Sequence, residues 1–213
     1  MEKQNDGVAT PLYTREGLGV SLIKQDLRAM MNGVASAAMR EAGMTADYRV
    51  NFGVELPRLQ TLADEIKENS AIFSEELGGV PATGLKSLAQ ELWHERVREC
   101  RILALMLYPA EAFYGELADV WIDDVRTVEL AQLAAFYLFS RMPLASVTAF
   151  QWIADEREIR QITGYYTLAN LLRTAQLSER SAQELRDQAA TALQSGNRQL
   201  VLAAQRALDR LPQ

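Results

Sequence analysis

Apolar residues recur at helical spacing along most of the chain, and this pattern constrains the fold more than any other sequence feature. No stretch alternates apolar and polar residues between turn-forming pairs, so we expect no strands. Pro109 and Pro143 each fall at a junction between apolar segments. The sequence therefore predicts an all-α fold, with helical segments at 85–93, 95–108, 110–121, 127–141, 144–153, 155–174, 178–194 and 197–211.

These predicted helices form pairs. Those at 97–108 and 128–139 are apolar nearly all round, so neighbours must cover them on several sides. The last helix instead has one apolar face, which suits a terminal cap. Pairs recur every roughly 30 to 40 residues, in or just below the HEAT range. The pattern favours a HEAT-like or armadillo-like helical repeat solenoid, an α-α superhelix, and leaves an ordinary helix bundle as the alternative.

The N-terminal third is less regular. An apolar stripe predicts one helix within 16–41, which Gly43 ends as a C-cap. Residues 44–55 are expected to connect it to a helix with Pro57 in its first turn. A cluster of Gly and Pro predicts a loop over 69–84. We expect a flexible leader at 1–14 and a single domain over 15–213.

Composition limits the function classes. The chain of 213 residues has no apolar run near 18 residues, and residues 1–9 lack the apolar core of a secretory signal, so we expect a cytoplasmic protein without a membrane span. The single Cys and single His have no partners at ligand spacing, so we expect no metal and no cofactor. A net charge of −6 argues against DNA binding through overall basicity. Residues 126–213 nevertheless carry 10 basic and 8 acidic groups, so either a local positive strip or a merely solvated surface fits.

Two segments carry a family resemblance. Residues 48–59 contain Gly53-Val54 followed by Pro57-x-Leu59, and residues 88–93 read Leu-Ala-Gln-Glu-Leu-Trp before the helix that starts at Glu95. Both are similar to the repeats of the DNA alkylation repair family, and the likeness covers roughly residues 48–211. The resemblance implies HEAT-like repeats whose concave basic groove binds duplex DNA, alkylated duplex included. Active members excise N-alkylated purines without flipping the base.

This chemistry implies particular site residues. In this family a catalytic aspartate stabilises the oxocarbenium charge. The residue of this chain that resembles it is Glu129, which keeps the carboxylate. Arg160 resembles the family's phosphate-binding arginine. Val125 and Arg206 stand where the family has aromatic residues that face the cationic nucleotide. The candidate catalytic residues are therefore Glu129 and Arg160.

Further candidates surround these positions. Trp121 and Trp152 are expected either to replace the lost aromatic residues or to pack in the core. Arginines near the predicted helix starts are candidate phosphate ligands. Alternatively, they form ion pairs with nearby carboxylates. These arginines are Arg98, Arg101, Arg126 and Arg157. Glu129, which lies among apolar residues, is expected either to pair with an arginine or to serve catalysis.

Three functions remain open at this point. The first is a DNA glycosylase for alkylated purines, the second a non-catalytic DNA-binding protein and the third a HEAT-like scaffold for a protein partner. Whether the chain is an enzyme is left open. We expect a monomer that acts on DNA.

Overall fold

The computed structural model describes residues 19–45, 48–77 and 81–212. The expected leader at 1–14 lies outside these residues. Within them the chain is helical, and an isolated parallel bridge between Val50 and Val97 is the one strand-like contact. The elements are α1 (Val20–Ala29), α2 (Gly33–Glu41), α3 (Leu56–Leu77), α4 (Pro81–His94), α5 (Arg98–Leu107), η1 (Ala110–Ala112), α6 (Gly115–Ile122), α7 (Val128–Tyr137), η2 (Phe139–Arg141), α8 (Ala145–Ile153), α9 (Glu158–Leu171), α10 (Glu179–Ala192) and α11 (Arg198–Leu208). The predicted all-α fold is confirmed.

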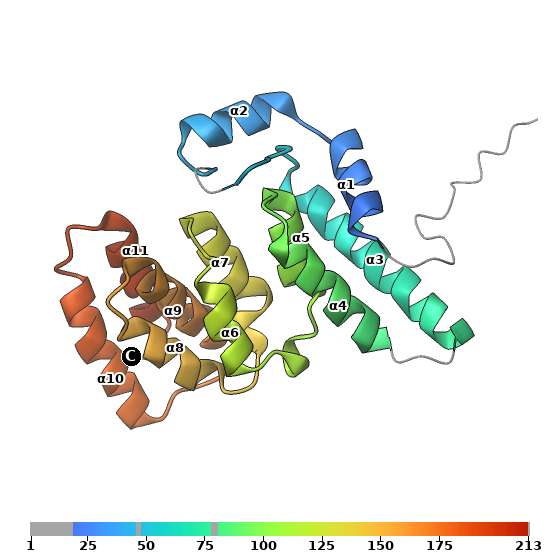
Figure 1. Cartoon of the computed structure of the whole chain (residues 1–213). Helices are drawn as coiled ribbons and strands as arrows, with labels where there is room; N and C mark the ends of the chain where they lie inside the picture. Colours follow the sequence, from blue (N-terminus) through green and yellow to red (C-terminus); the bar gives the residue numbers. More distant parts are fainter. Residues whose placement is uncertain (1–18, 46–47, 78–80, 213) are drawn as a thin grey trace, which may run out of the picture.

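The helices from α4 onward form a two-layered solenoid (Figure 1). Helices α5, α7, α9 and α11 stack in chain order, each in contact with the next. On one side of this row, α4, α8 and α10 pack against α5, α9 and α11. None of the described helices is long and apolar enough to cross a membrane.

The stacked helices lie with their N-terminal ends side by side. Arg98 at the start of α5 contacts Glu129 in the first turn of α7. The amide of Asn197, which caps α11, donates to Glu158 at the start of α9 over 2.7 Å. Polar contacts thus join α5 to α7 and α9 to α11 at one edge of the solenoid. The candidate residues Arg98 and Glu129 lie at this edge.

The predicted single helix over 16–41 is wrong, because two helices meet at Asn32. The backbone N–H of Asn32 donates to the carbonyl of Phe52 over 2.9 Å, and its side chain caps α2 by accepting from the N–H of Ala35 over 3.0 Å. A tertiary contact with a distant segment thus interrupts a continuous apolar stripe. The predicted end of this region is confirmed at Gly43, which has φ +71°.

The predicted loop over 69–84 is also wrong. Helix α3 continues to Leu77 and α4 begins at Pro81, while 78–80 lie outside the described residues. Proline suits a first helical position because its missing N–H has no intrahelical acceptor there. Gly84 then lies inside α4, where glycine is tolerated at a modest loss of stability.

The segment 48–54 crosses the start of α5 and is fixed to it. The buried carboxylate of Glu99 accepts from the backbone N–H groups of Phe52, Gly53 and Val54, over 3.1, 3.0 and 3.3 Å. Gly53 has φ +71°, and a Cβ there would collide with the backbone of α2 at Ser36. This segment, called the connector below, is therefore held rigidly against the solenoid.

Candidate functional site

Glu129, the predicted catalytic carboxylate, forms a bidentate ion pair with Arg98. The Nε and Nη2 atoms of Arg98 donate to Oε2 and Oε1 of Glu129 over 2.9 and 2.5 Å. The side chain of Glu129 is 17% exposed and that of Arg98 3%. The remaining Nη1 of Arg98 donates to Glu99 and to the carbonyl of Val54. Of the two alternatives for Glu129, the geometry supports pairing with an arginine.

The charge on Arg98 is maintained despite its burial. Burial lowers the pKa of this guanidinium, but hydrogen bonds and charge from Glu129 and Glu99 outweigh that effect and raise it above the ordinary value. Both carboxylate oxygens of Glu129 are occupied by the same partner. The negative charge of Glu129 is therefore balanced by Arg98.

The side chains around Glu129 supply no aromatic surface at the positions that the resemblance implied. Val125 is fully buried, and Arg206 is exposed on α11. Trp121 and Trp152 are buried in the core. Trp121 stacks on Trp93 at 4.2 Å between ring centroids. The core-packing alternative fits both of these tryptophans.

Arg101 also has a structural place. Its Nη1 donates to the carbonyl of Asp124 over 2.8 Å, and its Nε donates to the carbonyl of Glu95 over 3.3 Å. The guanidinium lies 5.3 Å from the ring centroid of Trp93. Arg101, like Arg98, is therefore directed into the protein, and phosphate binding would require it to leave these partners.

Arg157 and Arg160 belong to a surface ion-pair cluster with two aspartates. Arg160 contacts Asp123 and Asp155 over 2.5 and 3.2 Å, and Arg157 contacts the same carboxylates over 2.7 and 3.0 Å. Hydrogen bonds from Arg157 lower the pKa of Asp155, and those from Arg160 lower that of Asp123. Two guanidinium groups are thus balanced by two carboxylates, which leaves little net charge for a phosphate.

Arg126 differs from these arginines. It lies in the turn before α7, its side chain is exposed, and it contacts no carboxylate in the part of the chain that the structure describes. The structure therefore brings Glu129 and Arg98 together, places Arg157 and Arg160 in a separate cluster, and leaves Arg126 open to solvent.

Sequence reasoning missed a groove on the N-terminal side, of about 530 Å³, between α1, the connector and the turn that joins α4 to α5. We call it the basic groove; it is lined by Lys24, Arg28, Arg49, Val50, Phe52, His94, Glu95, Arg96 and Val97. Lys24 pairs with Glu95 over 3.0 Å. The other three permanent cations are exposed and contact no carboxylate among the described residues. In a chain of net charge −6, this groove carries local positive charge.

Main-chain pairing creates this concentration of charge. The N–H of Arg49 donates to the carbonyl of Arg96 over 2.8 Å, which holds two residues that are far apart in sequence side by side. Lys24 and Arg28, four residues apart on α1, lie on one helix face. That spacing was the only sequence signal for the groove, because the contact between Arg49 and Arg96 depends on the tertiary fold.

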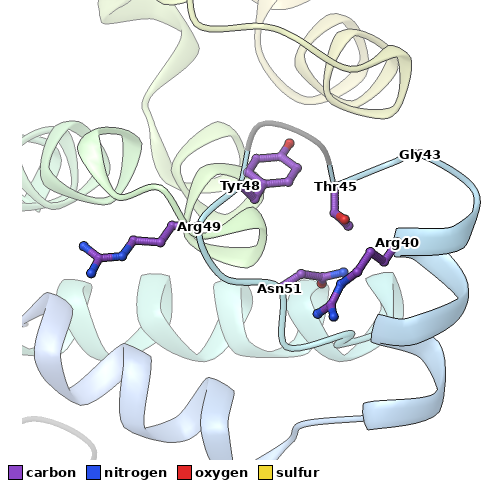
Figure 2. Close-up of a pocket in the computed structure, with 6 residues that line it drawn as sticks. All are labelled: Arg40, Gly43, Thr45, Tyr48, Arg49 and Asn51. Carbon is purple, nitrogen blue, oxygen red and sulfur yellow. The ribbon is translucent and has the colours of Figure 1, made fainter.

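A second pocket, of about 320 Å³, adjoins the connector (Figure 2). The described residues that line it are Arg40, Gly43, Thr45, Tyr48, Arg49 and Asn51, and none of these six carries a carboxylate. In Figure 2 the side chain of Arg49 points away from the other labelled residues. Arg49 therefore lies at the border between this pocket and the basic groove, which it also lines.

Among the described residues, no group of three or more His, Cys, Asp or Glu is placed to hold a metal ion.

Comparison with known proteins adds to this geometry. A family model described as "DNA alkylation repair enzyme" matches residues 23–197. A solved structure, from work described as "A new family of proteins related to the HEAT-like repeat DNA glycosylases with affinity for branched DNA structures", has a TM-score of 0.74. It is 18% identical, and the match covers 91% of this chain and 75% of that chain. At this identity the likeness shows the fold, a HEAT-like repeat.

A short sequence match concerns a different protein. A 48-residue stretch is 40% identical to pyruvate, phosphate dikinase from Giardia intestinalis. This match spans 22% of the chain and 5% of that protein. It covers too little of either protein to indicate a function.

Proposed function

Since this chain belongs to the DNA alkylation repair enzyme family, we propose that it binds DNA through the basic groove and does not excise bases. The observation that carries the proposal is the convergence of Arg28, Arg49 and Arg96, all exposed and without carboxylate partners in the described residues, on one groove of an acidic protein.

Arginine suits the DNA backbone. Its planar guanidinium donates two parallel hydrogen bonds to a phosphate and remains charged at any physiological pH. Each phosphate that is neutralised releases condensed counterions, which supplies most of the sequence-independent affinity. A groove with several such groups and one carboxylate, itself paired with Lys24, therefore fits a polyanion.

The ion pair at Glu129 supports the non-catalytic part of the proposal. In this family, base excision uses a carboxylate near the deoxyribose and aromatic faces against the cationic nucleotide. Here the carboxylate is bound to Arg98, Val125 is buried, and Trp121 and Trp152 pack in the core. The solved relative with the same fold is described as having affinity for branched DNA, and we propose branched DNA as the ligand class of this chain too.

Fluorescence anisotropy tests this proposal with a labelled four-way junction and a matched duplex. Arg49→Ala combined with Arg96→Ala removes two groove charges but preserves the main-chain hydrogen bond between these residues. We expect this double variant to bind both DNAs more weakly. The control combines Arg180→Ala with Arg210→Ala, two exposed arginines far along the sequence, and should bind like the wild type.

Two outcomes would contradict the proposal. Equal DNA affinity of the two double variants would show that the basic groove is not part of the DNA-binding surface. Absence of binding by the wild type at moderate salt would favour the remaining alternative, a HEAT-like scaffold for a protein partner.

A second candidate function, excision of N-alkylated purines, is supported by one observation. Glu129, which resembles the family's catalytic aspartate, lies in the first turn of a stacked helix and is 17% exposed. Incubation with methylated duplex DNA tests it through the amount of free base released. Release above the buffer level that is lost in Glu129→Gln would establish a glycosylase, whereas release equal to buffer would exclude one.

A further inference from the structure

An exposed aromatic ring lies close to two arginines at the C-terminal end of α7. The side chain of Phe136 is 38% exposed. The guanidinium carbons of Arg141 and Arg173 lie 5.7 and 5.9 Å from its ring centroid, within the range of a cation–π contact. Tyr137 meets the same ring edge-on, at 4.9 Å between centroids. We call Phe136, Arg141 and Arg173 the aromatic platform.

The platform is assembled from three parts of the chain. Phe136 comes from α7, Arg141 from η2, and Arg173 from the turn that follows α9. Both arginines are exposed, and neither contacts a carboxylate within the described residues. Their charge is therefore not balanced locally, unlike that of Arg157 and Arg160, which share two aspartates.

The platform continues a helix face that begins at Glu129. Glu129, Gln132 and Phe136 are three, four and seven residues apart, which places them on one face of α7. At 1.5 Å per residue, Phe136 lies about 10 Å along the helix from Glu129. Gln132, between them, is exposed and donates to the hydroxyl of Tyr166 over 2.9 Å. One open face of α7 thus joins the predicted site to the platform.

We propose that the aromatic platform binds an unpaired nucleobase of DNA by stacking. This inference rests on the proposed function, because it assumes a DNA ligand and assigns it a further contact. Every nucleobase has a π-face that stacks on an aromatic ring or on a guanidinium plane. The two arginines also balance the phosphates on either side of the stacked base.

The chemistry of the platform selects this ligand class. An exposed apolar ring alone would suit any hydrophobic partner. Two permanent cations beside the ring add attraction for a polyanion, and duplex DNA does not present its base faces. A polyanion with accessible aromatic faces is DNA that has unpaired nucleotides, such as a gap, an overhang or an open branch point.

The test compares DNA with and without unpaired bases. Phe136→Leu keeps an apolar side chain but removes the π-face, and Phe136→Trp restores one. We measure the affinity of each variant by anisotropy for a gapped duplex, a fully paired duplex of the same length, and a single strand. Because stacking contributes about 1–3 kcal/mol per base, Phe136→Leu should bind gapped DNA about 5- to 150-fold more weakly.

The controls separate stacking from other effects. Affinity for the fully paired duplex should change less than about twofold in Phe136→Leu, and Phe136→Trp should retain wild-type affinity for gapped DNA. Tyr114→Leu removes an aromatic side chain that is 62% exposed, and it should bind all three DNAs like the wild type. A 2-aminopurine in the gap should lose fluorescence on binding to the wild type but not to Phe136→Leu.

The outcomes for this inference and for the proposed function differ. One outcome is that Phe136→Leu binds gapped DNA like the wild type while Arg49→Ala with Arg96→Ala loses duplex binding. This would contradict base stacking on the aromatic platform and support DNA binding in the basic groove. Single-strand binding that depends on Phe136, without any duplex binding, would support the platform and overturn the groove. No binding to any of the three DNAs would overturn both.

Discussion

Arg98 and Glu129 are bound to each other through two hydrogen bonds, from Nε and Nη2 of the arginine to the two carboxylate oxygens. The pair joins α5 to α7, while Nη1 of the same arginine bonds the connector at Val54. The carboxylate that the sequence predicted to be catalytic therefore joins neighbouring repeats through Arg98, which also binds the connector.

The first prediction concerns the stability that this pair contributes. Removal of one partner from a buried ion pair costs about 3–5 kcal/mol. Because Glu129 is 17% exposed and Arg98 keeps Glu99, we expect a smaller loss for Glu129→Gln, about 2–3 kcal/mol in the free energy of unfolding. Urea denaturation measures it, with the exposed Glu156→Gln as control. Equal unfolding curves for the two variants would show that the pair is not structural.

A second prediction concerns the contact between α8 and α9. A Cβ on Gly164 would lie 2.7 Å from the carbonyl oxygen of Ala149 and 2.9 Å from a side-chain carbon of Ile153. Gly164→Ala should therefore destabilise the fold by about 1–3 kcal/mol, as overpacking does. Thermal unfolding checks this value.

A matched glycine in α4 provides the control. Gly84 also lies inside a helix, but a Cβ there meets nothing within 4 Å. Gly84→Ala should stabilise the protein by about 0.5–1 kcal/mol because alanine loses less backbone freedom on folding. A loss of stability in this variant would contradict the local structure of α4.

A third prediction concerns acid stability. The folded-state pKa of Asp155 is lowered by hydrogen bonds from Arg157, and that of Asp123 by those from Arg160, relative to about 3.9 in an unfolded chain. Groups with lowered pKa stabilise the fold above their unfolded pKa and lose that effect as the pH falls through the folded pKa. The difference in melting temperature between the wild type and Asp155→Asn should therefore be largest above about pH 5 and shrink in acid. A difference that does not vary with pH would contradict this.

A fourth prediction concerns Cys100, which is buried in α5. Burial, aided by the charge of Glu95, raises the pKa of its thiol to about 12. A thiol reagent at pH 8 should therefore leave the native protein unmodified and label it rapidly in urea. Rapid labelling of the native protein would show that α5 is less protected than the fold implies.

The sequence predicted the repeats well because their cause is local. Helices that must be covered on several sides are apolar nearly all round, as α5 is, and this pattern is visible without tertiary information. The break at Asn32 was missed because it follows from a contact with Phe52, twenty residues away. The helix around Gly84 was missed because Pro and Gly are common in loops. Pro81, however, occupies the first position of α4, where proline is compatible with a helix.

The site was predicted in part for the same reason. The sequence placed Glu129 and Arg98 on neighbouring repeats but could not determine whether the carboxylate is free or paired, since that depends on side-chain geometry. Arg49 was not singled out, because only the main-chain contact with Arg96 brings it into the basic groove. Charge pairing and groove formation are tertiary properties.

The salt dependence of DNA binding tests the central claim most directly. The logarithm of the binding constant should fall with the logarithm of salt concentration, with a slope of about −0.9 per phosphate contacted. The slope for Arg49→Ala with Arg96→Ala should be smaller in magnitude by about 2, and that for Arg180→Ala with Arg210→Ala should match the wild type. Identical slopes for the wild type and both double variants, or wild-type binding that does not respond to salt, would contradict DNA binding through the basic groove.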